Sequence, residues 1–152
     1  MNKDIKESLN DFMVYVFNQI LAWEGQTVKK TGVKNLTIRE LHTIEAVVNL
    51  TESGTNTMAN IAKFLCITPG ALTTNINSLV KKGYVERMYT PKDRRVIYIV
   101  PTTLGRRVNE IHEKFHARMI NHIIDILDDE ELPVLVKTLK NLGEYFNTKI
   151  EQ

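Results

Sequence analysis

The sequence contains little of several residue types, and each shortage excludes a class of protein. A single cysteine, Cys66, among 152 residues excludes a disulfide within the chain and a four-cysteine zinc module. The 20 Lys and Arg barely outnumber the 18 Asp and Glu, so the protein does not bind its partners through net charge. No apolar run approaches the roughly 18 residues that cross a bilayer, and the first residues show no signal-peptide core. We therefore expect a cytoplasmic protein with no membrane partner.

What the chain does contain is the pattern of an ordinary helical domain. Hydrophobic residues make up 43%, enough for one compact core. Between residues 5 and 21 they recur every three or four positions, which predicts a first helix that ends near Gly25. Residues 26–35 lose this period and are predicted to be a connector. A second helix is expected to follow Thr37, because Thr37 and Glu40 have the spacing of a capping box.

Two short helices come next, and their starts lie close together. Thr57 can cap the first, and Thr68 followed by Pro69 is a strong start for the second, because proline at the first helical position sacrifices no intrahelical hydrogen bond. The second helix is expected to run to about Lys82 and to end at Gly83. Joined by a short apolar turn in which Cys66 is expected to be a small core residue, these helices predict a helix-turn-helix.

The rest of the chain predicts a hairpin and two long helices. Residues 84–88 and 96–100 are rich in β-branched and aromatic side chains, and the segment TPKDRR between them carries a basic turn. Thr102 can cap a long amphipathic helix, and another begins at Asp128. Together with the first helix they carry wide apolar stripes that a chain of this size cannot easily cover, which favours a dimer.

These elements, and the run ITPGALTTNINSLVKKGYVERMYTPKDRRVIYIVPTTLG, resemble the MarR family of winged helix-turn-helix regulators. The resemblance implies a mainly α fold with a small β-hairpin wing, arranged as a single MarR-type domain over residues 1–152. Residues 1–30 and 102–152 would form the helical dimerisation region, and residues 37–101 the DNA-binding lobe. The function implied is a homodimeric, ligand-tuned transcriptional regulator, most simply a repressor, on a palindromic operator. Pro101 departs from the family's usual leucine and is expected to shorten the second strand.

The helix after Thr68 has a small, polar outer face. This face would be a solvated surface in most proteins, but Asn, Thr and Ser are mediocre helix formers, and their side chains can hydrogen-bond base edges in a major groove. Arginines at the hairpin tip suit a narrow minor groove, with Asp93 structuring the turn. The residues expected to contact double-stranded DNA are Thr68, Gly70, Ala71, Thr73, Thr74, Asn75, Asn77, Ser78, Lys81, Lys92, Arg94 and Arg95.

A separate group of residues is a candidate effector site. His112 and His116 are one helical turn apart, and with His42 and Glu24 they could complete a four-coordinate zinc site. The alternative is that these histidines are satisfied by neighbours at an interface. The same four residues match the ligands of the family's zinc-sensing members. The phrases RELHTIE and FHARMINHIID, however, are similar to the branch that represses fatty-acid synthesis genes with acylated carrier protein. No cofactor is required, and the effector stays open between zinc and an acyl group.

No arrangement typical of an enzyme competes with this interpretation. The sequence has neither a phosphate-cradling glycine loop nor a nucleophile with a base at a matching spacing, so we expect no catalytic activity. The alternative function is a helical dimer that holds a protein partner without binding DNA. The basic hairpin beside a polar helix face favours DNA, because protein-binding grooves more often expose aromatic residues or Met.

Overall fold

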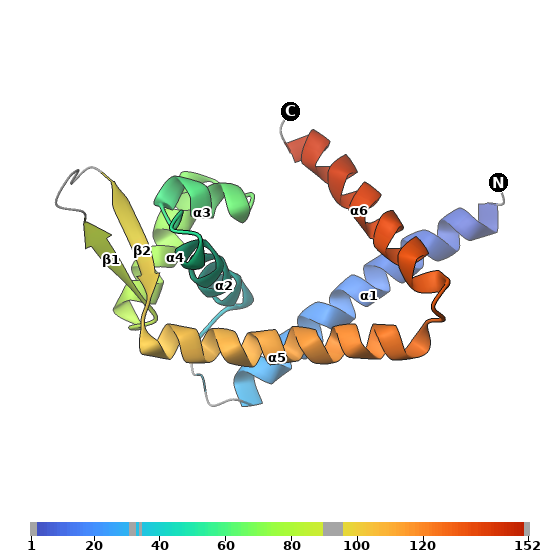
Figure 1. Ribbon diagram of the computed structural model, residues 1–152, viewed down its shortest axis with the longest axis horizontal. Coiled ribbons are helices and arrows are strands. Elements are labelled where there is room, and N and C mark those ends of the chain that lie inside the picture. Colours follow the sequence, from blue (N-terminus) through green and yellow to red (C-terminus); the bar gives the residue numbers. More distant parts are fainter. Residues whose placement is uncertain (1–2, 31–32, 34, 90–95, 151–152) are drawn as a thin grey trace. The chain divides into compact units, whose positions relative to one another are not determined.

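A computed structural model describes residues 3–30, 33, 35–89 and 96–150. These residues form six helices and one two-stranded sheet (Figure 1). They divide into two compact units, Met1–His112 and Glu113–Gln152. The expected mainly α fold with a β-hairpin is confirmed. The elements are α1 (Lys3–Lys30), α2 (Ile38–Glu52), α3 (Met58–Phe64), α4 (Pro69–Lys81), β1 (Val85–Tyr89), β2 (Ile97–Pro101), α5 (Thr103–Ile126) and α6 (Glu131–Ile150).

The core of the first unit lies between α2, the helix-turn-helix and the hairpin. Helix α2 contributes Leu41, Ile44 and Val47, and all three are at most 1% exposed. Ile76 on α4 and Ile99 on β2 are fully buried in the same core. Burial of several such side chains contributes about 1.5–3 kcal/mol each, so this core fixes α4 relative to the hairpin.

Three threonines begin three of these helices, as the sequence predicts. The hydroxyls of Thr37, Thr57 and Thr68 accept hydrogen bonds from the backbone amides three residues later. The Glu40 carboxylate in turn accepts a hydrogen bond from the Thr37 amide at 2.9 Å, which completes the capping box. Gly83 has a φ of 79°, the left-handed conformation that ends α4 where the sequence places it.

The hairpin is regular along its described length. Strands β1 and β2 are antiparallel, with Val85 opposite Pro101 and Tyr89 opposite Ile97. The expectation that Pro101 shortens the second strand is wrong, because both strands have five residues and proline is tolerated at a strand end. Buried Asn56 holds the hairpin to the loop before α3: its side-chain amide donates to the Ile99 carbonyl at 2.7 Å, and its own carbonyl accepts from the Ile99 amide.

Two other sequence-based expectations fail in the first unit. Helix α1 does not end near Gly25 but continues to Lys30, because Val28 on this last stretch packs against the core and tertiary packing outweighs the low helix propensity of one glycine. Cys66 is exposed, although a core position is expected. Its φ of 52° turns the chain between α3 and α4, and the flanking Leu65 and Ile67 pack against the core instead.

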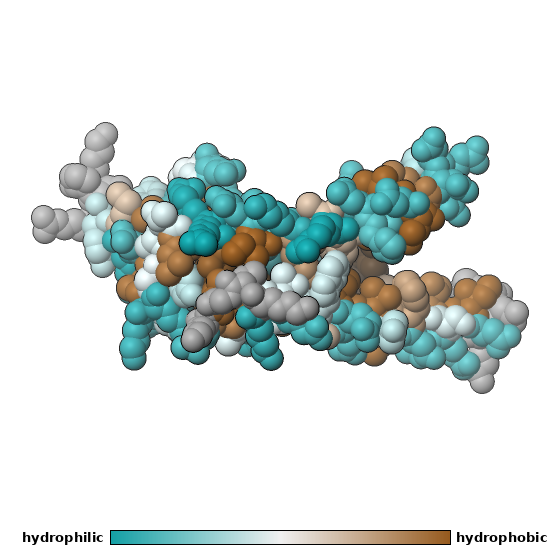
Figure 2. All heavy atoms as spheres, turned by 90° about the horizontal axis from the view of Figure 1, so that it is seen from below, coloured by the Kyte–Doolittle hydropathy of each residue, from teal (hydrophilic) through white to brown (hydrophobic). Residues whose placement is uncertain are grey.

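Helix α5 begins as expected, whereas α6 begins at Glu131 and not at Asp128, whose carbonyl accepts from the Glu131 amide at 3.0 Å. Both helices leave many apolar side chains uncovered. The Thr102 hydroxyl accepts from the Gly105 amide and caps α5. No residue of α6 is buried, and Phe146 is 50% exposed. Figure 2 shows broad areas of hydrophobic residues at the surface of one face. None of the helices among the described residues has both the length and the hydropathy to cross a membrane.

Candidate nucleic-acid interface

The outer face of α4 presents small and polar residues to solvent. Proline and glycine follow the Thr68 cap, so no large side chain in the first turn blocks close approach of another molecule. The hydroxyls of Thr73 and Thr74 donate to the backbone carbonyls one helical turn earlier, at 2.8 and 3.2 Å, although both residues are exposed. The candidate contact residues exposed on this helix and its cap are Thr68, Gly70, Ala71, Thr73, Thr74, Asn77 and Lys81.

Two of the candidates on α4 do not share that exposure. Asn75 and Ser78 are half-buried, and both side chains turn toward α2. The Asn75 amide donates to the Thr43 hydroxyl at 3.4 Å, and the Ser78 hydroxyl donates to the Glu40 carboxylate at 2.6 Å. The expectation that Asn75 and Ser78 lie on the exposed outer face is therefore wrong, and both side chains hold α4 against α2.

A buried carboxylate joins the start of α2 to the end of α4. Glu40 is 4% exposed, and its two oxygens accept from the Lys82 ammonium at 2.7 and 2.9 Å. Lys82 also donates to the Asn35 carbonyl at 2.5 Å. Burial raises the pKa of this carboxyl, but hydrogen bonds from Lys82, Ser78 and the Thr37 amide, with the ammonium charge, outweigh burial and hold the pKa below its ordinary value.

Asn77, at the centre of the exposed face, has a partner on the hairpin. The Arg87 guanidinium, on β1, donates to the Asn77 side-chain oxygen at 2.5 Å. Arg87 is half-buried and lies opposite Ile99 in the hairpin ladder, so its backbone is held in place. This hydrogen bond therefore joins α4 to β1, the first strand of the hairpin. The tip candidates Lys92, Arg94 and Arg95 lie outside the described residues.

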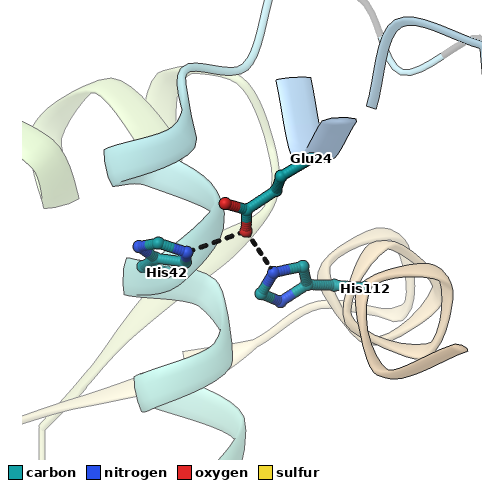
Figure 3. Close-up of side chains that lie close together, drawn as sticks. All are labelled: Glu24, His42 and His112. Atoms are coloured by element: carbon teal, nitrogen blue, oxygen red, sulfur yellow. Dashed lines mark hydrogen bonds and ion pairs between the residues drawn. The ribbon is translucent and has the colours of Figure 1, made fainter. Parts of the chain in front are cut away.

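The candidate effector residues gather around one carboxylate oxygen. Figure 3 shows Glu24 of α1 between His42 of α2 and His112 of α5. The same Glu24 oxygen lies 2.8 Å from Nε2 of His42 and 2.5 Å from Nε2 of His112. Glu24 and His112 are 2% and 3% exposed, whereas the His42 side chain is 39% exposed. The first unit thus brings three of the four predicted residues together.

This cluster has the donor set that a zinc ion takes. Its two imidazole nitrogens and one carboxylate oxygen lie within 4.8 Å of one another, and zinc in proteins is held by such ligands. Without a metal, the same atoms form hydrogen bonds between carboxylate and imidazole. The fourth candidate, His116, lies one turn further along α5 in the second unit, where its ring contacts Phe115 edge-on at 5.3 Å.

Sequence reasoning missed three residues that complete these sites. Glu45 places a carboxylate oxygen 3.6 Å from Nδ1 of His112, and its position three residues after His42 is a signal that could have found it. Arg87 and Lys82 were not expected to contact α2 or α4 side chains. The alternation of β1 places Arg87 on the same face as buried Val85, so strand periodicity could have pointed it toward α4.

Comparison with known proteins agrees with this architecture. A model described as the MarR family matches residues 36–97, a range that contains α2, the helix-turn-helix and β1 and ends at the first residue of β2. A second model, described as a PAS domain, matches residues 78–151. The described part of that range is the end of α4, the two-stranded hairpin, α5 and α6.

Individual relatives are similar over most of the chain. The transcriptional regulator AdcR of Streptococcus pneumoniae serotype 2, strain D39, is 31% identical over 110 residues, which are 72% of this chain and 70% of that protein. FabT of Streptococcus pneumoniae, solved in complex with DNA, is 32% identical with a TM-score of 0.86, over 94% of this chain and 98% of that one. MepR of S. aureus, also solved with DNA, has a TM-score of 0.69 at 22% identity, over 87% and 96% of the two chains.

Proposed function

This chain belongs to the MarR family of winged helix-turn-helix transcriptional regulators, and on that premise we propose that it is a homodimeric repressor. In this proposal, two copies of α4 occupy successive major grooves of a palindromic operator, and a ligand adjusts the occupancy. Repression follows because a dimer seated on promoter DNA excludes the transcription machinery.

The observation that carries the proposal is the exposed face of α4. Its first turn is small enough for close approach to a DNA backbone, and its helix N-terminus favours phosphate. Beyond that turn it offers threonine methyls and one fixed amide, the groups that read base edges. FabT of Streptococcus pneumoniae is solved in complex with DNA, which supports DNA binding by this chain.

The homodimer is supported by the apolar faces of the terminal helices. On α1, Leu9 and Phe12 are 59% and 61% exposed, and on α6 Leu139 is 55% exposed. A monomer rarely leaves such stripes in water, whereas obligate dimers bury about 2,000 Å² or more of this kind of surface. A dimer also supplies the two-fold symmetry that a palindromic operator requires.

Selection of binding sites from random duplex DNA tests the proposal. We expect a palindromic consensus with half-site centres about one helical turn apart, bound by two chains per duplex in light scattering. The logarithm of affinity should fall linearly with the logarithm of salt concentration. A protein that selects no sequence, or that binds as a single chain, contradicts the proposal and favours the protein-interaction alternative.

A zinc ion is the effector that the Glu24 cluster favours. Zinc would replace the hydrogen bonds between Glu24, His42 and His112 with bonds to the metal, and so alter how α1, α2 and the start of α5 meet. A ligand shifts operator affinity by the difference between its affinities for the two geometries. An acyl ligand, the other class left open by the sequence, would bind through an apolar cavity and not through this donor cluster.

Zinc titration against a competing chelator tests this assignment. We expect one zinc per chain at neutral pH, release as acidification protonates the imidazoles, and operator affinity that changes when the metal is removed. His42→Gln should weaken zinc binding at least 10-fold, whereas His122→Gln, at an exposed histidine outside the cluster, should leave it unchanged. If the two variants bind zinc alike and chelator does not alter operator affinity, the cluster is structural and an acyl effector is favoured.

A further inference from the structure

The contact between α4 and β1 fixes which atom of Asn77 faces outward. Arginine carries five N–H donors and no acceptor, so the amide atom that meets the Arg87 guanidinium is the oxygen. With its oxygen held on the hairpin side, the amide directs its NH₂ group away from β1. The Asn77 side chain itself is exposed, so that NH₂ group is available to a partner on the outer face of α4.

The base that an asparagine side chain prefers depends on whether its amide oxygen is free or already accepts a hydrogen bond. The free amide pairs with adenine through two hydrogen bonds, donating to N7 and accepting from the N6 amino group. An amide whose oxygen already accepts a charged hydrogen bond is a poorer acceptor for a second donor, and charge-assisted bonds are about twice as strong as neutral ones. What remains is a donor, and a donor pairs with base edges that carry acceptors.

We propose that Arg87 is a specificity-determining residue: by holding the Asn77 oxygen, it makes Asn77 select guanine or thymine over adenine. Guanine presents the acceptors N7 and O6 in the major groove, and thymine presents O4. This inference rests on the proposed insertion of α4 into the major groove. Arg87 acts here as a positioning residue, and Asn77 contacts the base.

The experiment compares operator selection by the wild type, Arg87→Met and Asn77→Asp. Arg87→Met frees the amide oxygen while keeping an unbranched side chain of similar length, so the preferred base at one position of each half-site should change to adenine. Asn77→Asp keeps an oxygen for Arg87 and replaces the NH₂ donor with a second acceptor oxygen, so the preference for guanine or thymine at that same position should be lost in favour of a base with an amino group, cytosine or adenine. In direct titrations, relative affinity for guanine or thymine over adenine should change about 5- to 100-fold there.

A matched control separates base selection from loss of charge. Lys81→Met removes an exposed cation from the same helix, and should weaken all duplexes equally and reduce the salt dependence while keeping the consensus. Arg87→Met overturns the inference if it keeps the wild-type consensus or weakens every sequence equally, as Lys81→Met does. If circular dichroism shows that Arg87→Met is unfolded, Asn77→Asp decides: retained preference at every position overturns the inference. A wild type with no consensus overturns the proposed function, and with it this inference.

Discussion

The side chain of Glu40 joins the start of α2 to the end of α4. Its carboxylate accepts from the Thr37 amide at the start of α2, from Ser78 on α4 and from the Lys82 ammonium. Each of these donors would lose a partner if the carboxylate were removed, and buried polar groups without partners cost about 1–3 kcal/mol each. The orientation of α4 on α2 is therefore set by a charged network as well as by apolar packing.

Glu40→Gln should lower the free energy of unfolding by about 1–3 kcal/mol at pH 7. The pKa of this carboxyl is lowered in the folded protein from its ordinary value of 4.5. The ionised carboxylate therefore stabilises the fold above pH 4.5, and this stabilisation is lost as the pH falls through the lower pKa of the folded protein. Urea denaturation across pH should show the difference between wild type and Glu40→Gln shrinking on acidification. Exposed Glu144→Gln is the control and should stay within about 0.5 kcal/mol of wild type; a pH-independent difference would contradict the ionised network.

At the scale of elements, the hairpin and α5 meet in a close backbone contact. A Cβ atom at Gly105 would lie 2.1 Å from the Tyr84 carbonyl oxygen, so α5 passes directly against the backbone that leads into β1. The Thr102 amide donates to the same carbonyl at 3.1 Å, and its hydroxyl donates to the Gly83 carbonyl at 2.7 Å. The wing is thus attached to α5 at the turn that ends α4.

Gly105→Ala should separate these elements and lower the free energy of unfolding by about 1–3 kcal/mol, the usual effect of overpacking. Gly143→Ala is a matched control, because Gly143 also lies within a helix but nothing lies within 4 Å of an added Cβ. There alanine should stabilise by up to about 1 kcal/mol through helix propensity. Thermal unfolding of both variants measures the contrast, and equal melting temperatures would show that α5 can move away from Tyr84 at no cost.

At the scale of the whole molecule, the two ends of the chain carry the apolar surface. The described residues of α1 expose Phe12 and Phe17 by 61% and 64%, and α6 has no buried residue. None of these side chains belongs to the core of the first unit. Dimerisation, in the proposed function, is what covers them.

Leu139→Asp should convert the proposed dimer to monomers, because a charge buried in an apolar interface without a partner costs several kcal/mol. Leu139 is exposed in the single chain, so the substitution should not unfold a monomer. Lys140→Asp, at an exposed position of the same helix, should remain dimeric. Sedimentation velocity gives the oligomeric state and operator titration the affinity, which should fall for Leu139→Asp alone. A fully dimeric Leu139→Asp would place the interface elsewhere.

The sequence by itself determined where the helices of the DNA-binding unit begin and how the helix-turn-helix leads into a hairpin. These features depend on residues three or four positions apart, such as the Thr37 and Glu40 capping box, and short-range interactions of this kind can be read from spacing alone. The proposed DNA-binding role of α4 also rests on its local composition together with the family resemblance. All of the predicted DNA-contact residues remain predictions, and those at the hairpin tip also lie outside the described residues.

Tertiary structure decided which polar residues face outward and which are held inside. Asn75 and Ser78 belong to the same polar run as Asn77, but their partners on α2 lie 32 and 38 residues away in the chain, and no local pattern specifies such a pairing. The same holds for Glu24 and His112, 88 residues apart, and for α1, which continues past Gly25 because its last turn packs on the core. Burial and hydrogen bonding between distant segments outweigh the local propensity of about 1 kcal/mol per residue, so only the folded chain fixes these positions.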